Sequence, residues 1–272
     1  MTGDDKASIS VRKYIKWGVR AFPINVIAQL TRLFRMNHLP SQPRKYIPLL
    51  TWYDCMHIKT PANFQTIRTL VLTSPRKHYV DTRLLMPVDS THQITTIEWA
   101  FAGTSSTTPA TDGKPEHTIW THWVDSTTPN AEAVKDEGDM ITLETGDVVE
   151  RGEMVNPKTG KMEAYEESWR DIRPLGEKVG WVVKAQGQGA RGMVVRIGGF
   201  AQGVLRRGSE VGIKRWRYMG GEQGWDPIIG IKNCDVPEEL FGAKGSEMVE
   251  GDKFMSGDGL EWECVEKFVG HW

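Results

Sequence analysis

Through the last three quarters of this chain, apolar and polar residues alternate in short segments, and this alternation is the feature that most constrains the fold. In TTIEWAFAG, Ile97, Trp99 and Phe101 share one face of an extended strand, and Glu98 lies on the other. The segment GLEWECVEKF, residues 259–268, alternates in the same way. Because successive side chains of a strand point to opposite faces, a period of two predicts half-buried β-strands.

Seven further segments have the same character and are separated by turn residues such as Gly, Pro and Asp. They are RTLVLTS (68–74), HYVDTRLL (78–85), HTIWTHWVD (117–125), GWVVKA (180–185), GMVVRIGGF (192–200), VLRRG (204–208) and EVGIKRWRYM (210–219). Helical spacing is nearly absent after residue 66. Strands that follow one another without intervening helices favour antiparallel barrels or a sandwich over βαβ units. We therefore predict an all-β chain with few helices.

The length of 272 residues predicts one large domain or two small ones. Residues 131–167 are acidic and rich in turn residues, so we expect long loops and a weak hairpin there. Pro174 and Gly176 follow, and we place the domain boundary near residues 172–178. The predicted organisation is a first strand within residues 1–18, a first barrel with acidic loops over residues 66–175, and a second barrel over residues 176–272.

Residues 19–65 do not share the strand pattern. Apolar residues at helical spacing over residues 26–34 allow an amphipathic basic helix, as in an organelle-targeting segment. The codons allow another interpretation, because residues 19–20 and 64–65 can be encoded by the donor and acceptor sequences of a fungal intron. Removal of the segment would join KYIKWG directly to TIRTLVLTS. Our hypothesis is a translated intron, and the alternative is a disordered or helical insertion.

Composition limits the classes of function. The net charge is −1 and the pI is near 6.7, as in ordinary globular proteins. No run of 18 apolar residues occurs and the N-terminus lacks a secretory signal, so we expect an intracellular protein without a membrane span. Residues 1–53 hold nine Lys or Arg and two Asp, but these charges are scattered singly, and we expect no nucleic-acid binding.

The widely spaced Cys55, Cys234 and Cys264 predict free thiols.

Two motifs suggest ligand sites, and their sequence context argues against both. Gly187-x-Gly189-x-x-Gly192 spells a dinucleotide fingerprint, but strand-like MVVRIGG follows where a helix N-terminus is required, so we predict a hairpin loop. His117 and His122 are an odd number of residues apart, which places them on opposite faces of a strand and argues against a metal site. The sequence therefore predicts no metal and no cofactor.

Eleven tryptophans are the most unusual feature of the composition. Large indoles can fill a small barrel, and a barrel of about eight strands can instead enclose one small ligand, so both roles are open. In a ligand cavity, Arg196 or Arg215 would anchor the polar end of a flat apolar molecule. The candidate cavity residues are Trp99, Trp123, Trp169, Arg196, Trp216 and Trp262. Trp99 and Trp262 lie in the clearest alternating segments, and we expect both to be buried, one in each barrel.

The segment YEESWRDIRP lies just before the predicted boundary. We expect Trp169 either to bury against both halves of the chain or to line a pocket, since pockets prefer domain junctions. We expect Arg170 to pair with a carboxylate.

Four segments resemble a known family. IEWAFAGTSS (97–106), YEESWRDIRP (165–174), GMVVRIGGFAQGVL (192–205) and GLEWECVE (259–266) are similar to the fungal HRI family, named for a yeast protein that associates with a casein kinase. The resemblance covers roughly residues 66–272 plus SVRKYIKWG and skips residues 19–65, which supports the intron hypothesis. It implies two successive calycin-like, lipocalin-like barrels in a protein of cytoplasm and nucleus, without an established catalytic activity.

Two function classes follow. The first is a non-enzymatic protein that binds a small apolar ligand, a protein partner such as a casein kinase, or both. The second is a cofactor-independent cyclase, isomerase or Diels–Alder catalyst of fungal secondary metabolism, in which an aromatic cavity holds a reactive conformer. Fold alone does not decide between them.

Overall fold

The structure is a computed structural model that describes residues 6–19, 67–85, 96–232 and 234–270. The hypotheses for residues 20–65 lie outside the described residues. Within the described ranges the chain forms fifteen strands, three 3-10 helices and one short α-helix. None of the described helices is long and apolar enough to cross a membrane.

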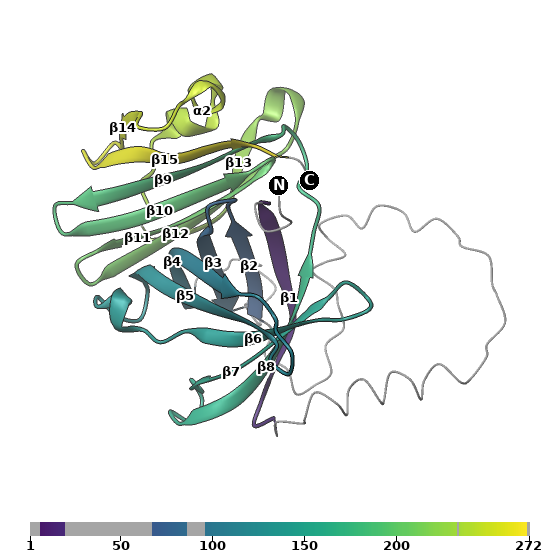
Figure 1. Ribbon diagram of the computed structural model, residues 1–272. Helices are drawn as coiled ribbons and strands as arrows, with labels where there is room; N and C mark the ends of the chain where they lie inside the picture. Colours follow the sequence, from purple (N-terminus) through teal and green to yellow (C-terminus); the bar gives the residue numbers. More distant parts are fainter. Residues whose placement is uncertain (1–5, 20–66, 86–95, 233, 271–272) are drawn as a thin grey trace, which may run out of the picture.

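The first unit is a closed antiparallel barrel in which each strand pairs with the next and β8 pairs back to β1 (Figure 1). Its strands are β1 (Ser8–Trp17), β2 (Ile67–Thr73), β3 (His78–Leu85), β4 (Ile97–Thr108), β5 (Glu116–Asp125), β6 (Glu137–Thr142), β7 (Val148–Val155) and β8 (Met162–Asp171). Ser10 lies opposite Asp171 in the pairing that closes the barrel. The 3-10 helix η2 (Ala131–Ala133) connects β5 to β6.

Strands β6, β7 and β8 occupy most of the acidic stretch that we expected to form loops and a weak hairpin. That expectation was wrong because the carboxylates of Glu150, Glu166 and Glu167 are themselves buried in the barrel wall or interior. Arg151 and Lys16 pair with Glu166, which allows this charged side chain to pack within a strand. Low hydrophobicity is therefore a poor guide to loops where a barrel has a charged interior.

The second unit is a seven-stranded antiparallel sheet of order β13-β12-β11-β10-β9-β15-β14. Its strands are β9 (Val179–Gly187), β10 (Ala190–Ile197), β11 (Phe200–Arg207), β12 (Glu210–Tyr218), β13 (Trp225–Ile231), β14 (Lys253–Met255) and β15 (Glu261–Val269), with η3 (Gly221–Gln223) between β12 and β13. The predicted all-β fold of two consecutive antiparallel barrels with few helices is confirmed, with a closed barrel as the first unit and a seven-stranded sheet as the second.

The glycine-rich motif forms the β9–β10 hairpin, as predicted. Gln188 and Gly189 form its two-residue loop with φ of 52° and 72°, the left-handed geometry of a primed hairpin turn. Gly192 packs against Trp262, and a Cβ added to this glycine would lie 2.6 Å from the Trp262 ring. The three glycines therefore serve a turn and a close packing contact.

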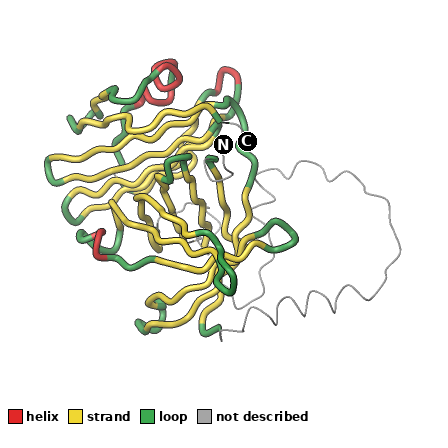
Figure 2. Tube along the Cα trace, viewed as in Figure 1, coloured by secondary structure: helices red, strands yellow, loops and turns green. Residues whose placement is uncertain are grey.

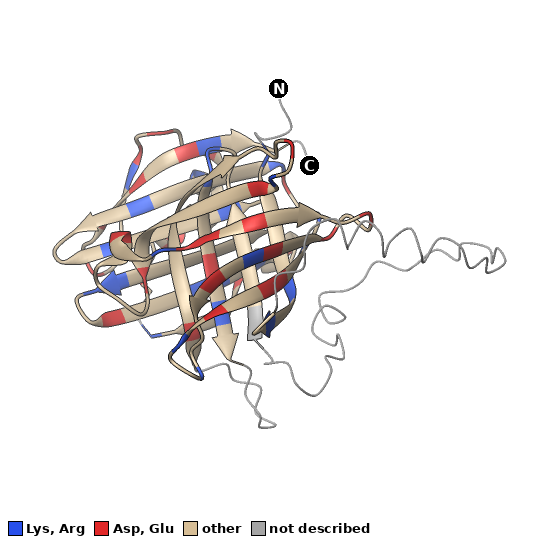
Figure 3. Cartoon of the chain, turned by 60° about the horizontal axis from the view of Figure 1, so that its bottom comes forward, with Lys and Arg blue, Asp and Glu red and all other residues tan. Residues whose placement is uncertain are grey.

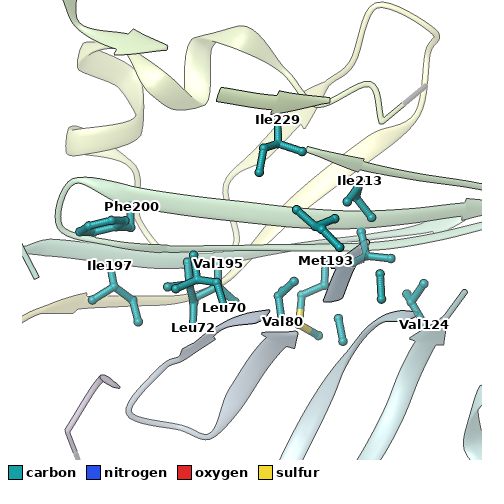
Figure 4. Close-up of a cluster of buried hydrophobic side chains, with 14 of the residues drawn as sticks. Leu70, Leu72, Val80, Val124, Met193, Val195, Ile197, Phe200, Ile213 and Ile229 are labelled. Carbon is teal, nitrogen blue, oxygen red and sulfur yellow. The ribbon is translucent and has the colours of Figure 1, made fainter. Parts of the chain in front are cut away.

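The sheet lies across the outer surface of the barrel, with β10 and β11 against β2 to β5 (Figure 1). One apolar core fills this interface, and Figure 4 shows its side chains meeting between the two layers. Its barrel members are Ile9, Leu70, Leu72, Val80, Leu84, Ala100, Ala102 and Val124, and its sheet members include Val182, Met193, Val195, Ile197, Phe200, Val204, Ile213 and Ile229. Each fully buried aliphatic side chain contributes about 1.5–3 kcal/mol, so this core binds the two units together.

A buried glutamine crosses the same interface. The side-chain nitrogen of Gln202 donates to the carbonyl oxygens of Leu70 and Val80, at 2.8 and 2.6 Å. Its side-chain oxygen accepts hydrogen bonds from Thr82 Oγ1 and Arg215 Nε, at 3.0 and 3.2 Å. Arg215, which we considered as a ligand anchor, therefore contributes to the junction of the two units.

The opposite face of the sheet is covered by η4 (Glu238–Phe241) and α2 (Ala243–Glu247), which precede the edge strand β14 (Figure 2). These segments enclose a second core that includes Trp181, Val194, Leu240, Phe254 and Trp262. Both faces of the sheet are thus buried, one against the barrel and one against the C-terminal segments.

Candidate functional site in the barrel

Strand β3 shows why the barrel has a polar interior. Val80 and Leu84 point outward into the core shared with the sheet. Because side chains alternate along a strand, Tyr79, Asp81 and Arg83 point into the lumen, where they line a cavity. All five residues are buried. The apolar face of this barrel wall is its outer face, since the second sheet covers it.

The cavity in the lumen has a volume of about 290 Å³. Its apolar wall includes Val71, Phe101, Trp120, Met140, Val148 and Trp169. Its acidic side chains are Asp81, Glu116, Asp136, Glu150 and Asp171, and Arg83 is the basic residue of the described lining. Ligand sites combine an apolar wall with convergent polar groups, often of perturbed pKa. Charged groups lie on the strands themselves (Figure 3), and the lumen is the candidate functional site.

Arg83 is the centre of a buried charge cluster. Its Nη2 lies 3.0 Å from Asp81 Oδ2 and its Nη1 lies 3.2 Å from Glu167 Oε1. Arg12 Nη1 contacts the same oxygen of Glu167 at 2.6 Å. The Arg83 guanidinium also lies 4.9 Å from the centroid of the Trp99 ring. Burial raises the pKa of Asp81, against the opposing attraction of Arg83 and Arg12. Loss of one member would leave uncompensated buried charge.

Glu150 lies directly opposite Glu167 in the pairing of β7 with β8 and is held by two neutral donors. The Tyr165 hydroxyl donates to Oε1 at 2.5 Å, and the Trp169 indole donates to Oε2 at 2.8 Å. Burial, together with the negative charges of Glu167 and Asp136, raises the pKa of Glu150 to about 8. Near neutral pH this carboxyl group therefore holds a proton that it can release to the lumen.

His122 bridges two aspartates inside the barrel. Its Nδ1 lies 2.8 Å from Asp125 Oδ2 and its Nε2 lies 3.1 Å from Asp136 Oδ2. Its ring stacks on Phe101 with the centroids 4.3 Å apart. Burial alone would lower the pKa of His122, but the hydrogen bonds to Asp125 and Asp136 raise it. Asp136 also lines the cavity. The hydrogen-bonded groups Asp125, His122 and Asp136 can therefore hold a proton at the cavity wall.

Several buried polar atoms of the interior have no hydrogen-bond partner among the described residues. Tyr79 Oη and Asp81 Oδ1 belong to side chains of the cavity wall, and Arg12 Nη2, Thr69 Oγ1 and Glu167 Oε2 lie in the same barrel. Buried polar groups in folded proteins are almost always hydrogen-bonded. The cavity wall therefore offers a donor and acceptors to a small polar group.

Of the six candidate cavity residues, Trp169 lines this cavity, and Trp99 contacts Arg83 of its lining. Trp169 lines the cavity in the barrel lumen, whereas the pocket expected for it was one at the domain junction. Its neighbour Arg170 pairs with Asp147 at 2.7 Å. The half-buried Trp99 donates its indole N–H to Asp125 Oδ2 at 3.0 Å and lies beside Arg83.

The other four candidates lie outside the barrel lumen. Trp123 lies against the second sheet, beneath Lys184. Arg196, Trp216 and Trp262 lie on the far face of that sheet, where Trp262 is fully buried. Trp216 stacks on Phe241 with the ring centroids 4.4 Å apart, and Arg196 binds Glu177 at 2.9 Å. The structure therefore separates these residues from the lumen.

Sequence reasoning missed Asp81, Arg83 and Glu150. In HYVDTRLL, the charges of Asp81 and Arg83 stand two residues apart between apolar neighbours. Such spacing places two charges on one face of a strand. When the intervening positions are apolar, that pattern indicates a polar barrel interior with an apolar outside.

The described residues include no group of three or more His, Cys, Asp or Glu side chains that could hold a metal ion. Cys234 and Cys264 are free and buried. Cys55 lies outside the described residues.

The chain is similar in sequence to a protein family and in fold to a solved structure. A family model described as Protein HRI1 matches residues 55–266. This match begins inside residues 19–65, so it includes the end of the segment that we interpreted as an intron. The crystal structure of an uncharacterized protein from Saccharomyces cerevisiae superposes with a TM-score of 0.64 and 16% sequence identity, covering 97% of this chain and 99% of that chain. At that identity the likeness shows the fold alone. The curated proteins include no match to the chain.

Proposed function

The chain belongs to the HRI1 family, and we propose that it is a binding protein that holds one small molecule in the lumen of its barrel. The observation that carries this proposal is the cavity wall, in which Tyr79 Oη and Asp81 Oδ1 are buried without a partner among the described residues. A volume near 290 Å³ is at the low end of ligand sites. A barrel of eight strands is also the size that encloses one small ligand.

The lining supports a particular kind of ligand. Phe101, Trp120 and Trp169 provide flat apolar surface, as expected for a small apolar or aromatic molecule. The acidic groups outnumber Arg83 in the lining, so the polar end of the ligand is a hydrogen-bond donor or a cation. An ammonium group would also be attracted to the faces of the aromatic rings. The ligand class is therefore a small aromatic or apolar molecule with a donor or amine group.

Native mass spectrometry of protein purified from its own host tests this proposal. The variant Val148→Trp fills the lumen from β7, and Val155→Trp, at an exposed position of the same strand, is the matched control. We expect a retained small molecule in the wild type and in Val155→Trp, and none in Val148→Trp. Circular dichroism checks that both variants fold. Equal retention in both variants, or wild-type protein without a bound molecule, would contradict lumen binding.

The second candidate is the cofactor-independent cyclase, isomerase or cycloaddition catalyst. The observation that favours it is the hydrogen bond from His122 to Asp136 at the cavity wall, because a positioned acid–base group can move a proton on a bound molecule. Incubation of the recovered molecule with wild type and Asp136→Asn separates the two functions. Conversion that Asp136→Asn abolishes supports an enzyme, whereas an unchanged molecule supports a binding protein.

A protein partner such as a casein kinase, and a location in cytoplasm and nucleus, remain expectations from the family resemblance. Co-purification with a tagged casein kinase and fluorescence imaging of the tagged chain test them. The lumen variants Val148→Trp and Val155→Trp then show whether partner binding depends on the cavity.

A further inference from the structure

Three cations are grouped on the face of the second sheet that meets the barrel. Arg191 of β10 and Arg206 of β11 are direct cross-strand partners. Lys184 of β9 is the register partner of Met193, two residues beyond Arg191 on the same face. Like charges directly opposite one another destabilise a sheet. This arrangement therefore requires compensation from outside the strands.

Trp123 of β5 lies against two of these cations. Lys184 Nζ is 3.9 Å from the centroid of its ring, and Arg191 Cζ is 4.5 Å away. The indole Nε1 is buried without a hydrogen-bond partner among the described residues. Burial and the positive charge of Arg191 both lower the pKa of Lys184. Both cations therefore contact the ring, and the indole N–H is a further donor without a partner among the described residues.

The contacts within the protein neutralise this group only in part. Arg191 pairs with the exposed carboxylate of Glu132. Arg206 donates to carbonyl oxygens, those of Asp125 at 2.9 Å and Gly208 at 3.0 Å, which carry no net charge. Glu263 of β15 lies opposite Lys184 in the strand register. Among the described residues the two adjacent arginines share one ion-paired carboxylate, that of Glu132, so an excess of positive charge remains on this pair.

A second cavity, of about 370 Å³, opens at this group. Trp123, Arg191 and Arg206 line it together with the turn glycines Gly187 and Gly189, at which an added Cβ would meet no atom within 4 Å. It shares no lining residue with the cavity in the barrel lumen. The guanidinium fork matches the geometry of phosphate oxygens, and two adjacent forks favour a group with more than one negative charge.

We propose that this junction cavity binds the diphosphate or triphosphate group of a small molecule, held by Arg191 and Arg206. The anion would neutralise the cross-strand pair of arginines, and the open glycine turn leaves room for its oxygens. The site lies where the barrel meets the sheet, so its occupant would contact both units. This proposal is independent of ligand binding in the lumen.

Isothermal titration calorimetry with inorganic pyrophosphate tests the site at low ionic strength, since salt screens such contacts. We expect saturable binding to the wild type. Arg191→Gln and Arg206→Gln should each weaken it by about tenfold, the usual effect of losing one charged hydrogen bond. Lys178→Gln is the matched control, because it removes an exposed charge directly before β9. We expect this variant to bind pyrophosphate as the wild type does.

Two outcomes would overturn the proposal: no heat of binding in the wild type, or equal weakening by Lys178→Gln, which would indicate nonspecific attraction. Thermal unfolding of the variants guards against misfolding. The lumen variant Val148→Trp should bind pyrophosphate normally. Its retention of pyrophosphate would separate this site from the proposed lumen site.

Discussion

The indole of Trp169 donates a hydrogen bond to Glu150 Oε2 at 2.8 Å, while Tyr165 occupies the other carboxyl oxygen. Both donors are neutral, so they hold the carboxyl group in place without supplying a positive charge that would lower its pKa. The proton on Glu150 is therefore tied to the fold of the barrel, because an unfolded chain would release it at a much lower pH.

Glu150→Gln should remove a pH dependence from stability. The folded pKa of Glu150 is about 8 against an ordinary 4.5, so over this interval the folded state binds the extra proton and wild-type stability falls as pH rises. The fall from this group is on the order of 1 kcal/mol per pH unit. The variant should therefore gain stability relative to the wild type from about pH 4.5 to 8, and the difference should then level off. Urea unfolding at several pH values measures it.

The exposed Glu153 lies on the same strand, and Glu153→Gln is the control for loss of a carboxylate. A stability difference between Glu150→Gln and wild type that stays constant with pH would show that Glu150 ionises normally.

His122→Gln should destabilise the protein most at low pH. The hydrogen bonds to Asp125 and Asp136 raise the folded pKa of His122 above its ordinary 6.5. Its stabilising contribution is therefore fully present below pH 6.5 and is lost as pH rises through the folded pKa. Unfolding free energies across this range should show the gap between variant and wild type shrinking with pH. His117→Gln, half exposed on the same strand, is the control, and a gap that widens with pH would refute the assignment.

Gln202→Leu should weaken the junction of barrel and sheet by about 2–4 kcal/mol, because it leaves buried hydrogen-bonding groups of both units without partners. The two units share one apolar core, so we expect a single unfolding transition that moves to lower denaturant. Gln186→Leu, an exposed position on the same sheet, should change stability little. Two separated transitions in the wild type would contradict a shared core.

Cys234 and Cys264 should resist thiol reagents in the native protein. Burial raises the pKa of Cys234 to about 12 and that of Cys264 to about 11, and the thiolate is the reactive form. A Cys55→Ser variant isolates these two thiols. We expect no labelling near pH 8 until the chain is denatured, when both react. An added exposed thiol, Ser209→Cys, verifies the reagent, and rapid native labelling of the other two would count against their burial.

Alternation in the sequence predicts the strands well, since period two appears wherever one face of a strand is buried. It does not tell which face is inside a barrel. Val80 and Asp81 alternate as in any half-buried strand, and only the position of the second sheet makes the valine side the outer one. The site therefore had to be seen in three dimensions. The same holds for Trp123 and Lys184, which come together only when the sheet covers the barrel.

Pairing of β1 with β8 closes the barrel, and this has a consequence during synthesis on the ribosome. About 150 residues separate the end of β1 from the end of β8. At 5–20 residues per second, β1 emerges roughly 8 to 30 s before its closing partner is complete. Through that interval one edge of the nascent first strand has no neighbour to pair with, and such edges recruit other chains. Chaperone demand should therefore be greatest before β8 is translated.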